Sequence, residues 1–362
     1  MRRPYDSRVR VRAAAIAITS LVVVAIARTA FGQSAVEADL QPLLAVRADA
    51  RVDSSLNDAD RAELTRTVEA SVTYVEELFE HRFVARPKLV LFGNTALFSA
   101  GLSDLFDYSE GNVQLSASNY GGIYDHATST IAVNLQVISA DARASTLEHE
   151  LTHYIVRELA GGRDLPAWFD EGVATLAERH PGGGSRWPEE DALIGRAIAA
   201  SDRVSLAQLE TLAGWHETYP RFGQALYLFA ENAVTQTRTR LGWRGVLGLI
   251  TAVASGRSFE DAYRAASGES VADLDVHVRS DRAPEMVSRR LPGGDAQYTV
   301  FTGKPLADEK VTIAGASTYS VTFVVRTDDL GLYRGTFGST APPGVYLVTA
   351  SGARVELATG RR

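Results

Sequence analysis

The sequence predicts an α+β protein with two domains, a mainly helical domain that also holds a small sheet, followed by a smaller all-β domain. Up to residue 283, apolar residues recur mostly at helical spacing, with short β-like runs only at residues 88–92 and 121–135. After residue 283, short β-rich runs separated by Gly and Pro turns replace the helical pattern. The length of 362 residues is enough for two cores of ordinary size.

The composition is that of a folded protein. Hydrophobic residues make up 45% and charged residues 22%, which argues against a disordered chain and against a polytopic membrane protein. The chain has no cysteine. Disulfides, thiolate zinc sites and cysteine nucleophiles are therefore excluded, and any metal must be held by nitrogen and oxygen ligands.

The first 32 residues have the layout of a secretory signal. Five arginines precede an uncharged apolar run at residues 13–27, and small residues flank Phe31. We expect cleavage after Gly32, which makes residues 1–32 a signal peptide and the protein secreted or periplasmic. The alternative is an uncleaved membrane anchor, although the run is shorter than the roughly 20 residues that a membrane span needs.

The mature chain is expected to be acidic. Residues 1–32 carry six arginines and one aspartate, so their removal changes the formal net charge from −7 to −7 − 5 = −12. No Lys/Arg-rich patch offsets this charge. Nucleic acid is therefore not expected as a partner, and a membrane is expected only if the N-terminal segment is retained.

The first part of the helical domain begins after a segment, residues 33–54, that is expected to be a linker or a short pro-like segment. Residues 58–81 carry apolar side chains at helical spacing, which predicts an amphipathic helix. A buried strand at 88–92 and a short helical segment from residue 93 follow. The stretch 121–135 is typical of a β-hairpin.

Two helices, residues 141–160 and 166–180, are expected next, separated by Gly161 and Gly162. A loop with three consecutive glycines comes after them. Further helical patterns lie at residues 191–200, 222–235, 243–254, 258–266 and 271–278.

The first of these two helices carries the candidate chemistry. His149 and His153 are four positions apart, so both side chains lie on one helix face and can reach one ion. A stripe of apolar residues occupies roughly the opposite side: Leu147, Leu151 and Ile155. Glu150 lies about 100° around the helix from His149, near enough to reach a metal-bound water, which predicts a general base.

A third metal ligand must come from elsewhere, because a hydrolytic zinc normally has three protein ligands and an open position. Glu171, on the next helix, is the candidate. If the two helices are antiparallel, His153 lies about 10 Å and Glu171 about 8 Å from the turn at 1.5 Å per residue, so their depths match. The alternative for Glu171 is a solvent-facing helix acid.

Gly172, next to this glutamate, should cost about 1 kcal/mol relative to Ala inside a helix. We expect its missing side chain to allow close approach of the first helix or of substrate. Trp168 is expected to be a core residue.

These residues resemble the gluzincin metallopeptidases, and within them the peptidase MA-like families. There the HExxH helix is followed by a Leu-Pro-x-Trp-hydrophobic-x-Glu-Gly-x-Ala segment, seen here at Leu165 to Ala174. The likeness covers residues 55–283 and implies a zincin-like metallopeptidase domain acting on a peptide or protein.

The resemblance also implies particular roles. It implies Zn²⁺ bound by His149, His153 and Glu171, with Glu150 as base and acid. It further implies that the strand at residues 129–135 is an edge strand that holds an extended peptide by strand addition.

Two departures from the family pattern concern residues around the metal. The family often has a tyrosine where this chain has Phe222, so the usual stabiliser of the oxyanion is missing. Candidate substitutes are Tyr219, His216 and Tyr227, and His216 has a packed loop histidine as its alternative.

The second departure concerns the residue that orients a histidine. Better-known gluzincins have an acid four residues after the glutamate ligand, and here that position is Thr175. Asp170 and Glu178 are nearby, and each is expected to be a solvent-facing acid. No role is expected for the remaining histidines: His81, His126, His180 and His277.

The end of the chain is expected to form an accessory domain. Residues 284–294 are expected to be a linker and residues 295–362 a β-sandwich, whose turn residues resemble the prealbumin-like domains often appended to secreted peptidases. No catalysis is assigned to it.

The function expected from the sequence is a secreted zinc metallopeptidase, either an endopeptidase or an aminopeptidase. Two alternatives remain. One is a zinc-bearing binding protein of the cell envelope with weak catalysis, and the other is a zinc hydrolase that acts on substrates other than peptides.

Overall fold

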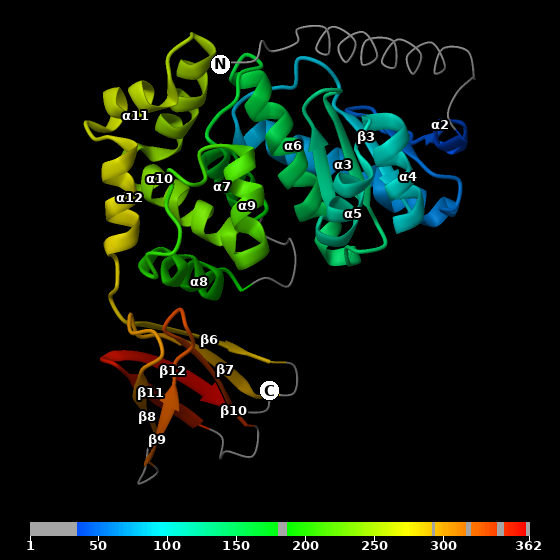
Figure 1. Cartoon of the computed structure of the whole chain (residues 1–362). Coiled ribbons are helices and arrows are strands. Elements are labelled where there is room, and N and C mark those ends of the chain that lie inside the picture. Colours follow the sequence, from blue (N-terminus) through cyan, green and yellow to red (C-terminus); the bar gives the residue numbers. More distant parts are fainter. Residues whose placement is uncertain (1–34, 180–186, 292–293, 316–319, 339–343, 360–362) are drawn as a thin grey trace, which may run out of the picture.

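The computed structural model describes residues 35–179, 187–291, 294–315, 320–338 and 344–359. The expected signal peptide, His180 and most of the triple-glycine loop lie outside these residues. The fold is mixed α+β, with a helical domain that contains one sheet and a terminal domain of two sheets (Figure 1). Among the described residues, no helix is long and apolar enough to cross a membrane.

The sheet of the helical domain has five strands in the order β1-β2-β3-β5-β4. They are β1 (Gln41–Pro42), β2 (Asp49–Val52), β3 (Lys88–Phe92), β4 (Gly122–Asp125) and β5 (Thr130–Asn134). The segment 33–54, expected to be a linker, therefore supplies two strands. Ala50 and Val52 are buried in the core, and β2 pairs in parallel with β3, which makes the segment part of the domain.

The hairpin of β4 and β5 is confirmed, but the edge strand is not the one expected. Because β5 pairs with β3 on one side and β4 on the other, the stretch 129–135 is internal and β4 forms the edge. Ile131, Ala132 and Val133 are all buried, as the unbroken apolar run of an internal strand requires.

Some helices alternate with the strands of the sheet along the chain, and the later helices follow it. The helices are α2 (Ala35–Asp39), α3 (Asp58–Leu78), α4 (Thr95–Phe106), α5 (Glu110–Asn119), η1 (Ala140–Ala142), α6 (Arg143–Leu159), α7 (Ala167–Ala177), α8 (Pro188–Ala200), α9 (Leu212–Phe222), α10 (Ala225–Ala254), α11 (Phe259–Ser267) and α12 (Val271–Ser280). In Figure 1, α3, α4 and α5 lie near the sheet, and α10, α11 and α12 lie on the other side of α7. The sequence patterns missed α2, α5 and α9. Those at 222–235 and 243–254 cover the two parts of α10, which meet at Gly242, where φ is 70°.

Helix α6 lies at the centre of the domain, between α3, α7 and the sheet. Leu147, Leu151 and Ile155 are at most 1% exposed, so the apolar stripe packs into the core as predicted. The opposite face, with both histidines and Glu150, is also buried. Neither face of α6 is therefore a solvent face, and its polar side chains need partners inside the protein.

Helix α10 packs so closely against α7 and α8 that one position on each of these two helices has room only for glycine. A Cβ atom at Gly172 of α7 would lie 2.5 Å from the backbone oxygen of Ala230, and one at Gly195 of α8 would lie 2.3 Å from that of Leu228. The close approach at Gly172 is thus made by α10, and not by the first helix or by substrate as expected.

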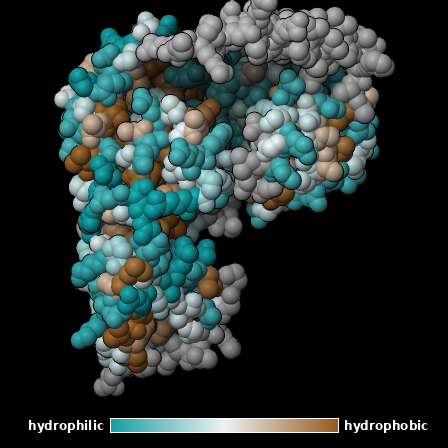
Figure 2. Space-filling view, viewed as in Figure 1, coloured by the Kyte–Doolittle hydropathy of each residue, from teal (hydrophilic) through white to brown (hydrophobic). Residues whose placement is uncertain are grey.

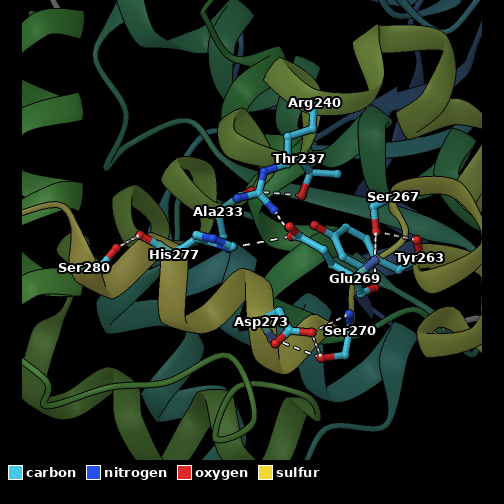
Figure 3. A network of polar contacts seen from close by, with 10 residues as sticks. All are labelled: Ala233, Thr237, Arg240, Tyr263, Ser267, Glu269, Ser270, Asp273, His277 and Ser280. Carbon is cyan, nitrogen blue, oxygen red and sulfur yellow. Dashed lines mark hydrogen bonds and ion pairs between the residues drawn. The ribbon is translucent and has the colours of Figure 1, made fainter.

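A network of polar contacts connects α12 to α10 (Figure 3). Arg240 of α10 donates to the carboxylate of Glu269, which lies 3.6 Å from Nδ1 of His277 on α12. Ser270 and Asp273 form a capping box that begins α12. His277 therefore belongs to the contacts that hold these helices together.

The terminal domain consists of two antiparallel sheets that share a core of buried apolar residues. Its strands are β6 (Glu285–Arg290), β7 (Ala296–Phe301), β8 (Asp308–Gly315), β9 (Ser320–Arg326), β10 (Leu332–Phe337), β11 (Gly344–Ala350) and β12 (Ala353–Thr359). The expected linker at 284–294 thus contains β6, which pairs with β7 along its whole length.

The two domains are in direct contact through α8. Trp187, Leu193 and Ala197 pack against Phe301 and Leu332 of the terminal domain. The visible surface of both domains is mostly hydrophilic, with apolar side chains in small separate groups (Figure 2). The terminal domain is therefore packed on the helical domain through an apolar contact.

We predict opposite effects for two Gly→Ala substitutions in helices. Gly172→Ala should lower the free energy of unfolding by about 1–3 kcal/mol, because its methyl group overlaps the backbone of α10. Gly248→Ala, at an exposed position of α10 with open space around it, should be neutral or raise stability by up to about 1 kcal/mol. Urea unfolding of both variants measures the difference, and equal effects would show that helix propensity alone matters at residue 172.

Candidate metal centre

The turn between α6 and α7 sets up the site. Gly161 and Gly162 have φ values of 65° and 77°, a left-handed conformation that glycine adopts without strain. The turn reverses the chain, so α7 packs along α6. His149 and His153 of α6 thereby face Glu171 of α7.

The three side chains form a group that could hold a metal ion. Oε2 of Glu171 lies 3.4 Å from Nε2 of His149 and 3.6 Å from Nε2 of His153, and the candidate ligand atoms all lie within 4.8 Å of one another. Two ligands that are each about 2.0–2.1 Å from one tetrahedral ion are about 3.3 Å apart, close to these separations. Oε2 of Glu171 is buried without a hydrogen-bond partner. A cation would be its missing partner.

Each histidine is held by a second acid. Nδ1 of His149 lies 2.5 Å from Glu178 Oε1, and Nδ1 of His153 lies 3.0 Å from Asp170 Oδ2. The sequence suggested that these two acids face the solvent, and this prediction is wrong, because both contact the histidines. Thr175 lies four residues after Glu171, at the position where better-known gluzincins have an acid. Its hydroxyl donates a hydrogen bond to the backbone oxygen of Glu171. A carboxylate on Nδ1 orients an imidazole so that Nε2 is free to bind a metal.

Burial and charge act in opposite directions on these groups. Burial lowers the pKa of His149, but the charge of Glu178 and the contacts with the carboxylates of Glu171 and Glu178 outweigh this effect and raise the pKa to about 9. Burial likewise lowers the pKa of His153, yet Asp170 and Glu171 raise it well above the ordinary value. Burial raises the pKa of Glu171, but the two imidazoles lower it to about 2. Without metal, the imidazoles therefore keep their protons at neutral pH.

Glu150 lies beside this group and against the edge strand. Its side chain is 6% exposed, and a Cβ atom at Gly122 of β4 would lie 2.8 Å from its Oε1. Burial raises the pKa of Glu150, while the charges of His149 and His153 lower it. Glycine at position 122 leaves the space that this carboxylate occupies, and the group is placed to accept a proton.

Three adjoining cavities form a cleft along β4. The central cavity, of about 400 Å³, is lined by both histidines, Glu150 and Glu171. A second, of about 550 Å³, shares His149, Glu150 and Gly122 with it, and a third, of about 370 Å³, shares His153. The candidate metal group is therefore open to a ligand that extends along the edge strand.

The three residues that are candidates for stabilising the oxyanion differ in their position relative to the central cavity. Tyr227 and His216 line the central cavity, and the ring of Tyr227 lies 5.8 Å from that of His149. Burial raises the pKa of Tyr227 well above its ordinary value, so its hydroxyl stays protonated. Tyr219 is not part of the wall of the central cavity, and its hydroxyl accepts a hydrogen bond from Gln224 at 3.3 Å.

Sequence reasoning missed several residues of the cleft. Tyr120, Tyr124 and His126 line the central cavity, although the sequence gave no role to the histidine. The ring of Tyr124 stacks on that of His153 at a centroid distance of 6.5 Å. The available signal was the cluster of aromatic residues in YGGIYDH, in the first arm of the expected hairpin.

Comparison with known proteins does not assign this chain to a family. No protein-family model matches the chain, and no curated protein matches it either. The case for a function therefore rests on the residues of the site.

We predict that Glu178→Gln weakens metal binding about tenfold, at the low end of the range for such partners, because glutamine keeps an acceptor but loses the charge. Competition with a chelator, using Zn²⁺ as the probe, measures the affinity. Glu217→Gln, an exposed acid on α9, is the matched control and should change nothing. Equal affinities of the two variants would contradict the role of Glu178.

We also predict that metal uptake releases protons. The metal-free pKa of His149 is raised to about 9, so a proton competes with the metal below that pH, and the competition grows as pH falls. The apparent Zn²⁺ affinity should therefore rise from about pH 6.5 to about pH 9. Calorimetry in buffers of different ionisation enthalpy counts the released protons. Metal uptake at neutral pH without proton release would contradict the raised pKa values.

Proposed function

We propose that this protein is a zinc metallopeptidase of the gluzincin type, with a zincin-like helical domain, and that it acts on peptides or proteins outside the cytoplasm. One observation carries the proposal. The Nε2 atoms of His149 and His153 lie around Oε2 of Glu171, which accepts no hydrogen bond, beside the buried carboxylate of Glu150 in a cleft bounded by an edge strand. The extracytoplasmic location rests on the signal-like residues 1–32.

Zinc is the proposed ion because two imidazoles and one carboxylate are a usual ligand set of catalytic zinc. His149, His153 and Glu171 would hold the ion, and its chemistry there would be to lower the pKa of a water molecule toward neutrality and to polarise a carbonyl group. Asp170 and Glu178 keep the two imidazoles oriented.

Glu150 is the proposed general base and acid. It would take the proton of the attacking water and deliver it to the leaving amine. Burial, which raises its pKa, favours the uptake of the proton from water. Gly122 keeps the space beside its carboxylate free.

The developing oxyanion needs a hydrogen-bond donor. Tyr227 is the first candidate, because it lines the cleft beside His149 and its phenol stays protonated. His216, on the exposed side of the same cavity, is the second. Tyr219 would support Tyr227 from behind, since their ring centroids lie 6.1 Å apart.

Glu150→Gln is the decisive variant. It should keep the bound metal and lose peptide hydrolysis by about 10²–10⁴-fold, because the base is removed while the ligands remain. Casein and a peptide library measure turnover of the full mature chain, with a chelator to abolish it and Zn²⁺ to restore it. Glu217→Gln is again the control.

The outcomes also separate the alternatives. Peptidase activity that survives in Glu150→Gln would refute the assignment. A wild-type chain that binds metal but cleaves no peptide would favour the envelope binding protein, and hydrolysis of esters or non-peptide amides alone would favour a different zinc hydrolase.

A further inference from the structure

We propose that the central cavity is a subsite for an aromatic or large apolar side chain, carried by the residue on the N-terminal side of the scissile bond. This inference rests on the proposed peptidase function and names its substrate class.

Two pairs of aromatic rings, from different parts of the chain, line the central cavity. On the β4 side, Tyr124 and His126 have ring centroids 4.9 Å apart. On the side of α9 and α10, Trp215 and Tyr227 have ring centroids 5.0 Å apart. A planar apolar group that enters this cavity gains both buried area and edge or face contacts with the rings.

The rim of this cavity carries an exposed apolar side chain. Leu212, at the start of α9, is 49% exposed and lies four residues before His216, so both project from one face of the helix into the cavity wall. An apolar ligand would cover the leucine and remove its surface from water.

The neighbouring cavities have different chemistry. The second is bordered by the hydroxyls of Ser145, Thr146 and Thr175. The third is bordered by the cationic side chains of Arg157 and Arg163, whereas the charged residues that line the central cavity, histidines apart, are acids. The two pairs of aromatic rings are thus a property of the central cavity among these three.

The register of β4 gives the direction of the substrate. The backbone nitrogen of Asn134 donates to the oxygen of Gly121, so alternate residues from Gly121 onward face β5. The N–H and C=O groups of Gly122 and Tyr124 therefore face the cleft, where no described strand pairs with them.

An extended peptide can pair with these groups, and antiparallel pairing is the more stable and more common arrangement. Such a peptide runs from the Asp125 end of β4 toward the Gly122 end. Both cavities are lined by Tyr120 and Gly122, but the central cavity continues along β4 past Asp125 to His126, whereas the second has no wall residue from β4 after Gly122. The side chain in the central cavity therefore precedes the cleaved bond.

The first test maps cleavage sites. Capped Ala/Gly peptides with a single Phe, Leu, Ala, Asp or Lys are incubated with the full mature chain, and mass spectrometry identifies the products. Cleavage after Phe should exceed cleavage after Ala by about tenfold or more in kcat/KM. Cleavage without that preference, or with Phe only after the cut, would overturn the subsite and leave the peptidase function standing.

The second test is binding, so that it does not depend on turnover. Calorimetry compares the Phe and Ala peptides on metal-free Glu150→Gln protein, alone and combined with Leu212→Ser. The Phe peptide should bind several-fold more tightly, and Leu212→Ser should reduce that ratio. Leu306→Ser, an equally exposed leucine of the terminal domain, should leave the ratio unchanged.

The two proposals fail differently. If wild-type protein cleaves nothing but the Phe preference in binding is present and depends on Leu212, the peptidase function fails and the aromatic subsite stands. Equal binding of Phe and Ala peptides would overturn the subsite.

Discussion

The site depends on one buried interaction, the contact of the Glu171 carboxylate with the imidazoles of His149 and His153. Ionised groups are costly to bury unless they are paired and hydrogen-bonded, and here the pairing extends outward. Asp170 and Glu178 hold the far side of the imidazoles. Each ring is thereby fixed from both sides, and its orientation is decided by the protein before any ligand arrives.

The balance of charge within this group favours a cation. Four acids surround two imidazoles: Glu150, Asp170, Glu171 and Glu178. Glu148, next to His149, is a fifth, and burial together with the charge of Glu178 raises its pKa to about 8, so it is mostly neutral at pH 7. Even with both imidazoles protonated, the group carries more carboxylates than positive charges. A divalent ion would offset that excess and would bind the buried oxygen of Glu171, which accepts no hydrogen bond.

Packing outside the site holds the two ligand helices and the cleft wall. Close contact of α10 with α7 is possible only because residue 172 has no side chain. Helix α8 supplies Asp191 and Ile194 to the second cavity, while the neighbouring Glu190 accepts hydrogen bonds from Thr299 and Arg334 of the terminal domain. The all-β domain thus helps to fix one wall of the cleft, although it contributes no residue to the metal group.

The sequence by itself determined which residues form the candidate metal group. His149 and His153 at helical spacing, the glycine turn and the matched depth of Glu171 define it, because helix periodicity and rise are local properties. Helices with strong apolar stripes and the short alternating strands of the terminal domain follow from the same local rules. The tertiary structure alone decided which strand is the edge, which helix approaches Gly172, and where Asp170 and Glu178 point. These depend on contacts between segments far apart in the chain, and no local period encodes the order of strands in a sheet or the partner of a buried acid.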